Sequence, residues 1–303
     1  SGSVLSPIDL SYSYTRSSNY AEAPGVPPLW YQLGLANRFS GDTLLANANR
    51  DVNTDFNAST SFRLKNLDGR IRYSRSWSRD LTGSTQSGSY TTGWPDLSVS
   101  LSSVERIAPR LWNSSSVSSG YSRQTVFAGN YQPGADTFDH FGRRLNSNIN
   151  LSPLLSWQAT WKNRMNTTAS ISHSYSDNSI YQDPERPTRS LGQNWNYSLN
   201  LSYSFSAPRG IRFPFLRKVK FSSDLDMNFG LTYATAYNST IDASNRETPT
   251  SNTGDLNTNA AFSYRFSRSI EAGLRTGYRI HYDFLGRRST RSVDIDFWVL
   301  FKF

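Results

Sequence analysis

A period-two alternation of apolar and polar residues is the feature that most constrains this chain, and it is clearest at the C-terminus. From residue 292 onward one set of alternate positions holds Val293, Ile295, Phe297, Val299, Phe301 and Phe303. The other set holds Ser292, Asp294, Asp296, Trp298, Leu300 and Lys302. Successive side chains on a β-strand point to opposite faces. The segment therefore predicts a strand with one apolar face and one largely polar face.

Four upstream runs, 194–206, 218–236, 255–267 and 269–284, alternate in the same way, and each is longer than the five or six residues usual for globular strands. Their polar positions hold Ser, Asn and Gly together with charged residues. We interpret these charged positions, with those of the last strand, as facing a water-filled lumen: Lys220, Asp224, Asp226, Arg265, Arg275, Arg279, His281, Asp294, Asp296 and Lys302. Acidic and basic residues share this face, so charge pairing is favoured over a cation site.

The aromatic content distinguishes a membrane barrel from a soluble sandwich. A sandwich buries its apolar faces between two sheets, whereas a membrane barrel turns its apolar face to lipid and places aromatic girdles at both rims. The chain has 17 Phe, 17 Tyr and 8 Trp, yet its hydrophobic fraction is only 36%. No apolar stretch approaches the roughly 20 residues of a transmembrane helix. We therefore predict an all-β fold, a transmembrane antiparallel β-barrel.

Placing the last strand's end at the periplasm assigns the aromatic residues to two girdles. The outer girdle takes Trp195, Tyr197, Tyr233 and Tyr282. The inner girdle takes Tyr203, Phe205, Phe221, Phe266, Phe301 and Phe303. Aromatic residues at both rims with aliphatic residues between them match what a bilayer requires.

The alternation and the turn residues predict thirteen strands in a single domain spanning 1–303. They are expected near 4–16, 28–40, 51–65, 69–82, 96–105, 114–128, 148–163, 166–176, 194–206, 218–236, 255–267, 269–284 and 290–303. Long extracellular loops are expected near 83–94, 129–146, 177–193 and 237–254. Bacterial single-chain barrels have even strand numbers, so the odd count predicts the C-terminal part of a larger barrel. A turn at Pro153 would instead give fourteen strands.

The C-terminal strand also resembles the signal that the barrel-assembly machinery recognises. A terminal Phe303 follows apolar residues at every second position, namely Ile295, Phe297, Val299 and Phe301. Recognition by strand addition to an exposed edge would fit this pattern. An ordinary last amphipathic strand would also produce it.

Several phrases resemble the SprA/Sov family, the outer-membrane translocon of the type 9 secretion system. The segment SPLLSWQATWKNRMNTTASISHSYS, residues 152–176, is similar to a late-barrel hairpin of the form PLLG-x-x-x-TWKN, with Ser156 in place of the glycine. LSVSLSSVERIAP (97–109) and LSPIDLSYSYTRSSNY (5–20) are similar to other late-barrel phrases. The resemblance implies part of a giant barrel that passes secreted protein cargo and opens laterally to gate or plug partner proteins.

Other function classes have little support in the sequence. No G-x-S-x-G elbow or recognisable Ser/His/acid arrangement is present, so we do not expect an enzyme. With no cysteine and three scattered histidines, we expect no metal or other cofactor. Basic residues are spread singly despite the net charge of +9, so we do not expect nucleic-acid binding.

We therefore expect a protein-translocation conduit in the outer membrane of a Gram-negative bacterium, with a periplasmic C-terminus. Outer-membrane lipid, the barrel-assembly machinery and secreted cargo are the expected partners. A free-standing 14-strand porin or small-molecule channel is the alternative with the same architecture. An adhesin or structural barrel that acts through its loops is the alternative of another class.

Overall fold

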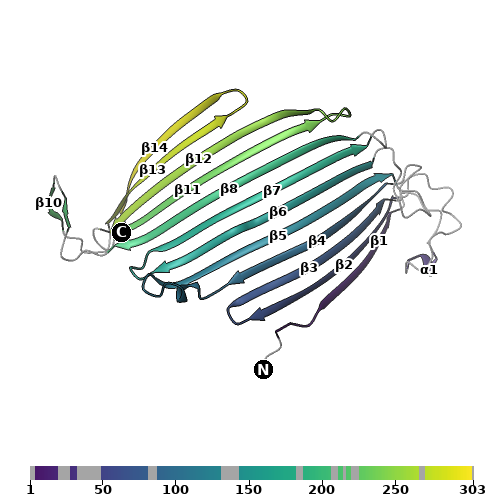
Figure 1. The fold of residues 1–303 in the computed structure, drawn as a ribbon, viewed down its shortest axis with the longest axis horizontal. Helices are drawn as coiled ribbons and strands as arrows, with labels where there is room; N and C mark the ends of the chain where they lie inside the picture. Colours follow the sequence, from purple (N-terminus) through teal and green to yellow (C-terminus); the bar gives the residue numbers. More distant parts are fainter. Residues whose placement is uncertain are drawn as a thin grey trace.

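The structure is a computed structural model that describes residues 4–19, 28–32, 49–80, 87–130, 143–181, 187–205, 211–213, 216–219, 225–265 and 270–301. Twelve antiparallel strands form one sheet in which each strand pairs with the next along the chain (Figure 1). Their bounds are β1 Asp9–Asn19, β2 Asn49–Leu64, β3 Leu67–Asp80, β4 Ser87–Leu101, β5 Trp112–Asn130, β6 Arg143–Trp161, β7 Asn166–Tyr181, β8 Thr188–Phe205, β11 Leu225–Ile241, β12 Glu247–Arg265, β13 Ile270–Asp283 and β14 Arg288–Phe301.

Four short elements lie outside this sheet among the described residues. Strands β9 (Ile211–Phe213) and β10 (Leu216–Val219) pair with each other as a separate hairpin. Helix α1 (Leu29–Gln32) is a single turn, and η2 (Val104–Arg106) is a short 3-10 helix between β4 and β5. Among the described residues, no helix has the length and apolar character needed to cross a membrane.

Polar side chains form the tight turns that join several strands. In the β11–β12 turn, Asp242 Oδ1 accepts hydrogen bonds from the backbone N–H groups of Ser244 and Arg246. In the β13–β14 turn, the Asp283 carboxylate accepts from the N–H groups of Leu285 and Gly286. Asp side chains favour turns because they satisfy backbone donors that have lost their strand partners.

Two strand predictions are wrong in detail. The expected strand at 28–40 is helical where it is described, because Leu29–Gln32 forms α1; a proline immediately before this turn suits a helix start. The expected strand at 218–236 merges two elements, since β10 ends at Val219 and β11 begins at Leu225. The same parity of apolar residues continues from Val219 to Leu225, so alternation alone did not reveal that β10 pairs with β9 outside the main sheet.

The expected long loops are shorter than predicted because the strands extend beyond their apolar stretches. Much of 83–94 belongs to β4, which begins at Ser87. Most of 237–254 is strand, and the β11–β12 turn spans only 242–246. Parts of the loops expected at 129–146 and 177–193 are also strand, because β5 extends to Asn130, β6 begins at Arg143, β7 extends to Tyr181 and β8 begins at Thr188; 131–142 and 182–186 lie outside the described residues. The Gly, Pro, Asn and Asp residues that predict loops in these stretches lie partly on strands, for example Asn238 in β11 and Pro249 in β12.

The strand count also corrects the topological argument. In the described part of the chain the main sheet has twelve strands, so the prediction of thirteen is wrong and the odd-number argument for a larger barrel does not hold. The alternative of fourteen strands, with a turn at Pro153, is also wrong, because β6 continues through Pro153 with only a register irregularity between Leu151 and Leu155. In the described part of the chain β1 pairs only with β2, and β14 only with β13. The sheet is therefore not closed into a barrel.

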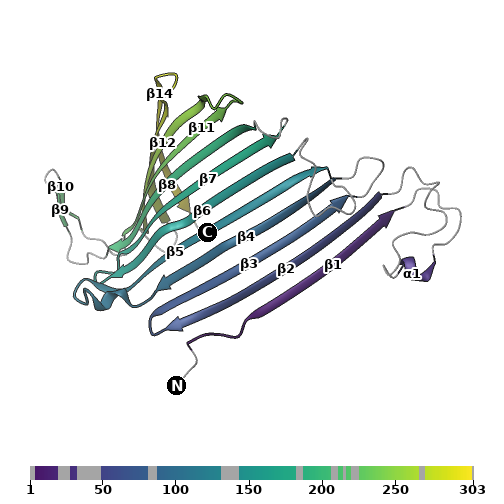
Figure 2. The same ribbon diagram turned by 45° about the vertical axis from the view of Figure 1, so that its right-hand side comes forward.

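The sheet is a single layer, curved rather than flat. Figure 2 shows β1–β4 broadside while β11–β14 turn nearly edge-on. Among described residues the only buried hydrophobic side chains are Ala159 and Ile280. Soluble sheets bury one face against a second layer, and the described part of the chain supplies none. We call the rim where β1 begins and β14 ends the terminal rim, and the opposite one the far rim.

Candidate functional site: the two faces of the sheet

One face of the sheet, the apolar face, is continuous across eleven strands. Cross-strand partners lie on the same face, so a row of partners can be followed from strand to strand. Starting at Leu64, the last residue of β2, the row is Leu64, Leu67, Leu101, Val117, Trp157, Ala169, Leu199, Leu231, Thr258, Tyr278 and Val293. Thr258 is the only clearly polar residue in it.

The other side, the polar face, is equally continuous. Starting at Asp283, the last residue of β13, the partners are Asp283, Thr253, Ala236, Asn194, Ser174, Asn150, Ser122, Asp96, Arg72, Ser59 and Asp9. Small polar residues dominate this row. The alternation predicted from the C-terminal strands therefore extends across the whole sheet.

The structure places seven of the ten charged positions predicted for the lumen on the polar face, as their register partners require. These seven are Asp226, Arg265, Arg275, Arg279, His281, Asp294 and Asp296. Lys220, Asp224 and Lys302 lie outside the described residues. Whether this face lines a lumen depends on the closure of the wall and stays a prediction.

Acids and bases meet on the polar face of the last strands. His281 Nδ1 lies 2.7 Å from Asp255 Oδ1, and Arg265 lies 4.0 Å from Glu271. Arg275 is the register partner of Asp296. Among the described residues, no group of three or more His, Asp or Glu side chains is arranged to hold a metal ion. The arrangement is that of a solvated, charge-compensated wall.

Aromatic side chains on the apolar face of the C-terminal strands contact one another in several places, and their assignment to two membrane girdles stays a prediction. Trp195 stacks with Tyr197 at 6.1 Å between centroids, and Tyr197, midway along β8, stacks at 6.1 Å with Tyr233, midway along β11. Near the terminal rim Tyr203 lies 6.1 Å from Phe205. Tyr282, next to the β13–β14 turn, stacks on Phe284. Phe221, Phe266 and Phe303 lie outside the described residues.

The N-terminal half has a matching set that the sequence analysis missed. At the far rim Trp77 lies 5.9 Å from Tyr90, which lies 6.4 Å from Phe127. At the terminal rim Trp112, Trp157 and Trp161 form a cluster with centroid separations of 5.7–6.2 Å. The parity of 71–79, which places Ile71, Tyr73 and Trp77 on one face, was the available signal.

The tryptophan cluster is held by hydrogen bonds to the neighbouring strands. Trp157 Nε1 donates to Ser115 Oγ at 2.8 Å, and Trp161 Nε1 donates to Thr167 Oγ1 at 2.8 Å. Both acceptor residues are buried. The indole N–H of Trp112 is buried and has no partner among the described residues.

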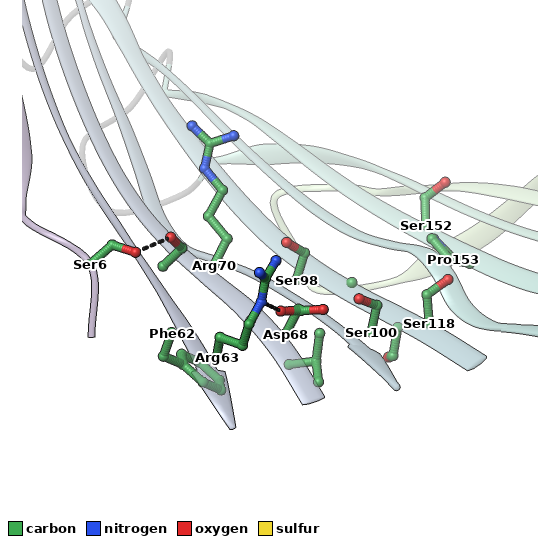
Figure 3. Close-up of a pocket in the computed structure, with 15 residues that line it drawn as sticks. Ser6, Phe62, Arg63, Asp68, Arg70, Ser98, Ser100, Ser118, Ser152 and Pro153 are labelled. Atoms are coloured by element: carbon green, nitrogen blue, oxygen red, sulfur yellow. Dashed lines mark hydrogen bonds and ion pairs between the residues drawn. The ribbon is translucent and has the colours of Figure 1, made fainter. Parts of the chain in front are cut away.

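The polar face has a hollow of about 650 Å³ near the terminal rim of β2–β6. In Figure 3, Arg63, Asp68, Arg70 and Ser98 lie on one side of the sheet and Phe62 points away on the other. Arg63 pairs with Asp68 across the β2–β3 turn. The remaining polar lining consists mainly of serine hydroxyls, which suits water or a passing polar chain better than one tightly held ligand.

The C-terminal strand exposes the apolar side chains of the predicted assembly signal. Phe297 is 79% exposed, and its neighbours on the same face are at least half exposed: Ile295, Val299 and Phe301. The backbone edge of β14 opposite β13 has no strand partner in the described part of the chain. Phe303 lies outside that part.

Neither the protein-family models nor the curated proteins that were compared with this sequence give a match. The similarity to the SprA/Sov family therefore rests on the short phrases quoted above.

Proposed function

We propose that this sheet is part of the wall of a transmembrane β-barrel in the outer membrane of a Gram-negative bacterium. The observation that supports it most strongly is the apolar face, continuous across eleven strands, which no second layer covers in the described part of the chain. Large side chains on this face are exposed on both edge strands, such as Tyr12 at 68% and Phe297 at 79%. Water penalises such a surface, whereas lipid accepts it, with aromatic residues at the two rims.

The stagger of the strands supports a barrel wall as well. The row of polar partners starts at the far rim with Asp283 in β13 and reaches the terminal rim at Asp9 in β1 after ten strand-to-strand steps. In β1 the far rim lies at Asn19, ten residues beyond Asp9 (19 − 9 = 10). The far rim therefore shifts by one residue per strand. With about 3.4 Å per residue and about 4.8 Å between strands, the tilt is roughly 35°. Membrane barrels have strands tilted by about 35–45°.

The two open edges of the sheet indicate how the wall is completed. Unpaired backbone groups are not tolerated where a strand faces hydrocarbon. The outer edges of β1 and β14 must therefore pair in the membrane, either with each other or with further strands. We propose further strands, since β1 and β14 diverge in the open sheet (Figures 1 and 2).

Within this wall we propose the function of a protein-translocation conduit of the SprA type, with no catalytic role. The polar face, rich in Ser and Asn and charge-compensated, suits the passage of a folded polypeptide because it offers no strong local binding site. The same face suits a free-standing porin, which is the second candidate. Closure of the sheet distinguishes the two candidates, because a free-standing porin would form a closed barrel from this chain alone, whereas the proposed conduit needs further strands.

Photocrosslinking in cells tests the conduit. A photoreactive residue at Asn200 on the polar face should crosslink to secreted protein during export, while one at the adjacent Leu199 on the apolar face should not. No protein adduct at Asn200 during active secretion, or equal adducts at both positions, would contradict the proposal. Discrete ion channels formed by this chain alone in a planar bilayer would favour the porin.

A further inference from the structure

The hollow on the polar face lies where the regular pairing of β5 with β6 is interrupted. Residues 119–121 of β5 lie opposite residues 151–155 of β6, so three residues of one strand face five of the other (122 − 118 − 1 = 3; 156 − 150 − 1 = 5). The extra length of β6 forms a bulge, from which Ser152 and Pro153 line the hollow. Its volume of about 650 Å³ falls within the range of about 300–1,000 Å³ found for ligand pockets.

Arg70 in β3 lies at the side of this hollow without an acidic partner. Its register partners are two serines, Ser61 in β2 and Ser98 in β4. Its side chain is exposed, and among the described residues it forms no hydrogen bond or ion pair. Figure 3 shows its guanidinium group projecting from the sheet on the side of the hollow. The row of register partners that contains Arg70 holds no carboxylate.

The other charged groups of the polar face near the terminal rim of β1–β6 are matched with one another. Arg63 pairs with Asp68 across the β2–β3 turn. The register row that contains Arg72 holds Asp96 in β4 and Asp9 in β1. No carboxylate of this part of the face is therefore left to neutralise the arginine beside the hollow.

Serine hydroxyls supply further hydrogen-bond donors in the hollow. Four of them have no hydrogen-bond partner among the described residues, those of Ser98, Ser100, Ser118 and Ser152. A hydroxyl can donate to a carboxylate oxygen, and an arginine can donate two parallel N–H bonds to the same carboxylate. The donors of the hollow therefore match the carboxylates of Asp and Glu side chains.

The terminal rim beside the hollow is basic. The described turns at this rim between β2 and β7 carry five exposed basic side chains, those of Lys65, Arg106, Arg110, Lys162 and Arg164. The one carboxylate of these turns, that of Glu105, accepts a hydrogen bond from the backbone N–H of Ser115. A surface that carries an excess of one charge attracts chains of the opposite charge and raises their local concentration. Acidic chains should therefore collect at this rim.

We propose that the hollow is a weak docking site for acidic segments of the polypeptide that passes through the conduit, with Arg70 binding their Asp and Glu carboxylates. This inference rests on the proposed function, which makes the polar face the path of the secreted chain. Weak binding suits that role, because a conducting site must also release its occupant. A single exposed ion pair contributes little affinity, so the basic rim and the serine hydroxyls act together with the arginine.

The test uses the full chain folded in detergent micelles, with a photoreactive residue in place of Ser118. Two probes are compared, a short peptide of Glu, Gly and Ser residues and the same peptide with Gln in place of Glu. The acidic peptide should crosslink with the higher yield, by about fivefold, the upper range for one exposed ion pair. R70Q should remove this preference, and R70K, which keeps the charge, should retain most of it. The matched variant R144Q removes an exposed arginine of the same face near the far rim and should keep the wild-type preference.

Equal yields for the two peptides, an unchanged preference in R70Q, or an equal loss in R144Q would overturn the inference. The conduit itself is judged separately, by crosslinking to secreted protein at Asn200 during export. Crosslinks at Asn200 without an acidic preference at residue 118 refute only the docking site. The absence of crosslinks at Asn200 refutes the conduit, whatever the peptides do.

Discussion

A charge placed on the apolar face should destabilise the protein according to its depth in the bilayer. Strands tilted by about 35° rise about 2.8 Å per residue along the barrel axis. Leu199 lies six residues before Phe205, the end of β8 (205 − 199 = 6), and so lies about 17 Å from the terminal rim. That is well inside an apolar band about 25 Å tall.

Leu191 is on the same face of the same strand but fourteen residues from Phe205 (205 − 191 = 14), about 39 Å from the terminal rim and beyond the band. Arginine costs about 2–4 kcal/mol at mid-bilayer and about 0–1 kcal/mol at the interface. L199R should therefore lower the free energy of unfolding by about 2–4 kcal/mol. L191R, whose register partner is Asp177, should cost less than about 1 kcal/mol.

Urea unfolding in phosphatidylcholine vesicles, followed by tryptophan fluorescence, measures both values. N200R, on the polar face next to Leu199, provides the control and should change stability by less than about 0.5 kcal/mol. Equal losses of unfolding free energy for L199R and L191R would refute a lipid-facing surface, because the cost of a charge in an ordinary protein core does not depend on depth in a bilayer. A larger loss for N200R than for L199R would invert the assignment of the faces.

Three further predictions concern packing and assembly. W157F should lower the free energy of unfolding in urea by about 1–2 kcal/mol because it leaves the buried Ser115 hydroxyl without its hydrogen-bond donor. W112F, whose indole N–H has no described partner, should be nearly neutral. Equal losses for the two variants would contradict this. G69A should cost about 1–3 kcal/mol because its Cβ would lie 2.1 Å from the Phe62 ring, and adding F62A should recover part of the loss in the same assay. Deletion of Phe303 should reduce the heat-modifiable, membrane-embedded protein seen by gel shift, and an unchanged amount would refute its role in assembly.

The alternation was sufficient to predict an all-β, antiparallel fold and the face on which residues such as Arg275 and Phe297 lie, because strand geometry fixes the period. The strand ends were harder to predict. Residues such as Ser87 and Asn252 are polar whether they sit in a loop or on a strand that extends past the apolar stretch, so composition could not separate the two. The segment at Leu29 is short and apolar, and a single helical turn and a strand look alike there.

Which side chains meet across neighbouring strands could not be predicted. The Trp112 cluster joins β5 and β6, and the pairing of Arg75 with Tyr90 depends on a register that includes an irregularity between Arg72 and Ser74. Such irregularities shift which residues meet without leaving a clear trace in a single sequence.

The most direct test of a barrel wall is to measure which face meets lipid. Spin labels placed singly along 196–203 of β8 in vesicle-reconstituted protein report collision with oxygen, which concentrates in lipid, and with a water-soluble nickel complex. If the apolar face meets lipid, accessibility alternates with a period of two: oxygen accessibility is highest at 197, 199, 201 and 203, and nickel accessibility is highest at 196, 198, 200 and 202. High nickel accessibility at 199 and 201, or no alternation, would contradict it.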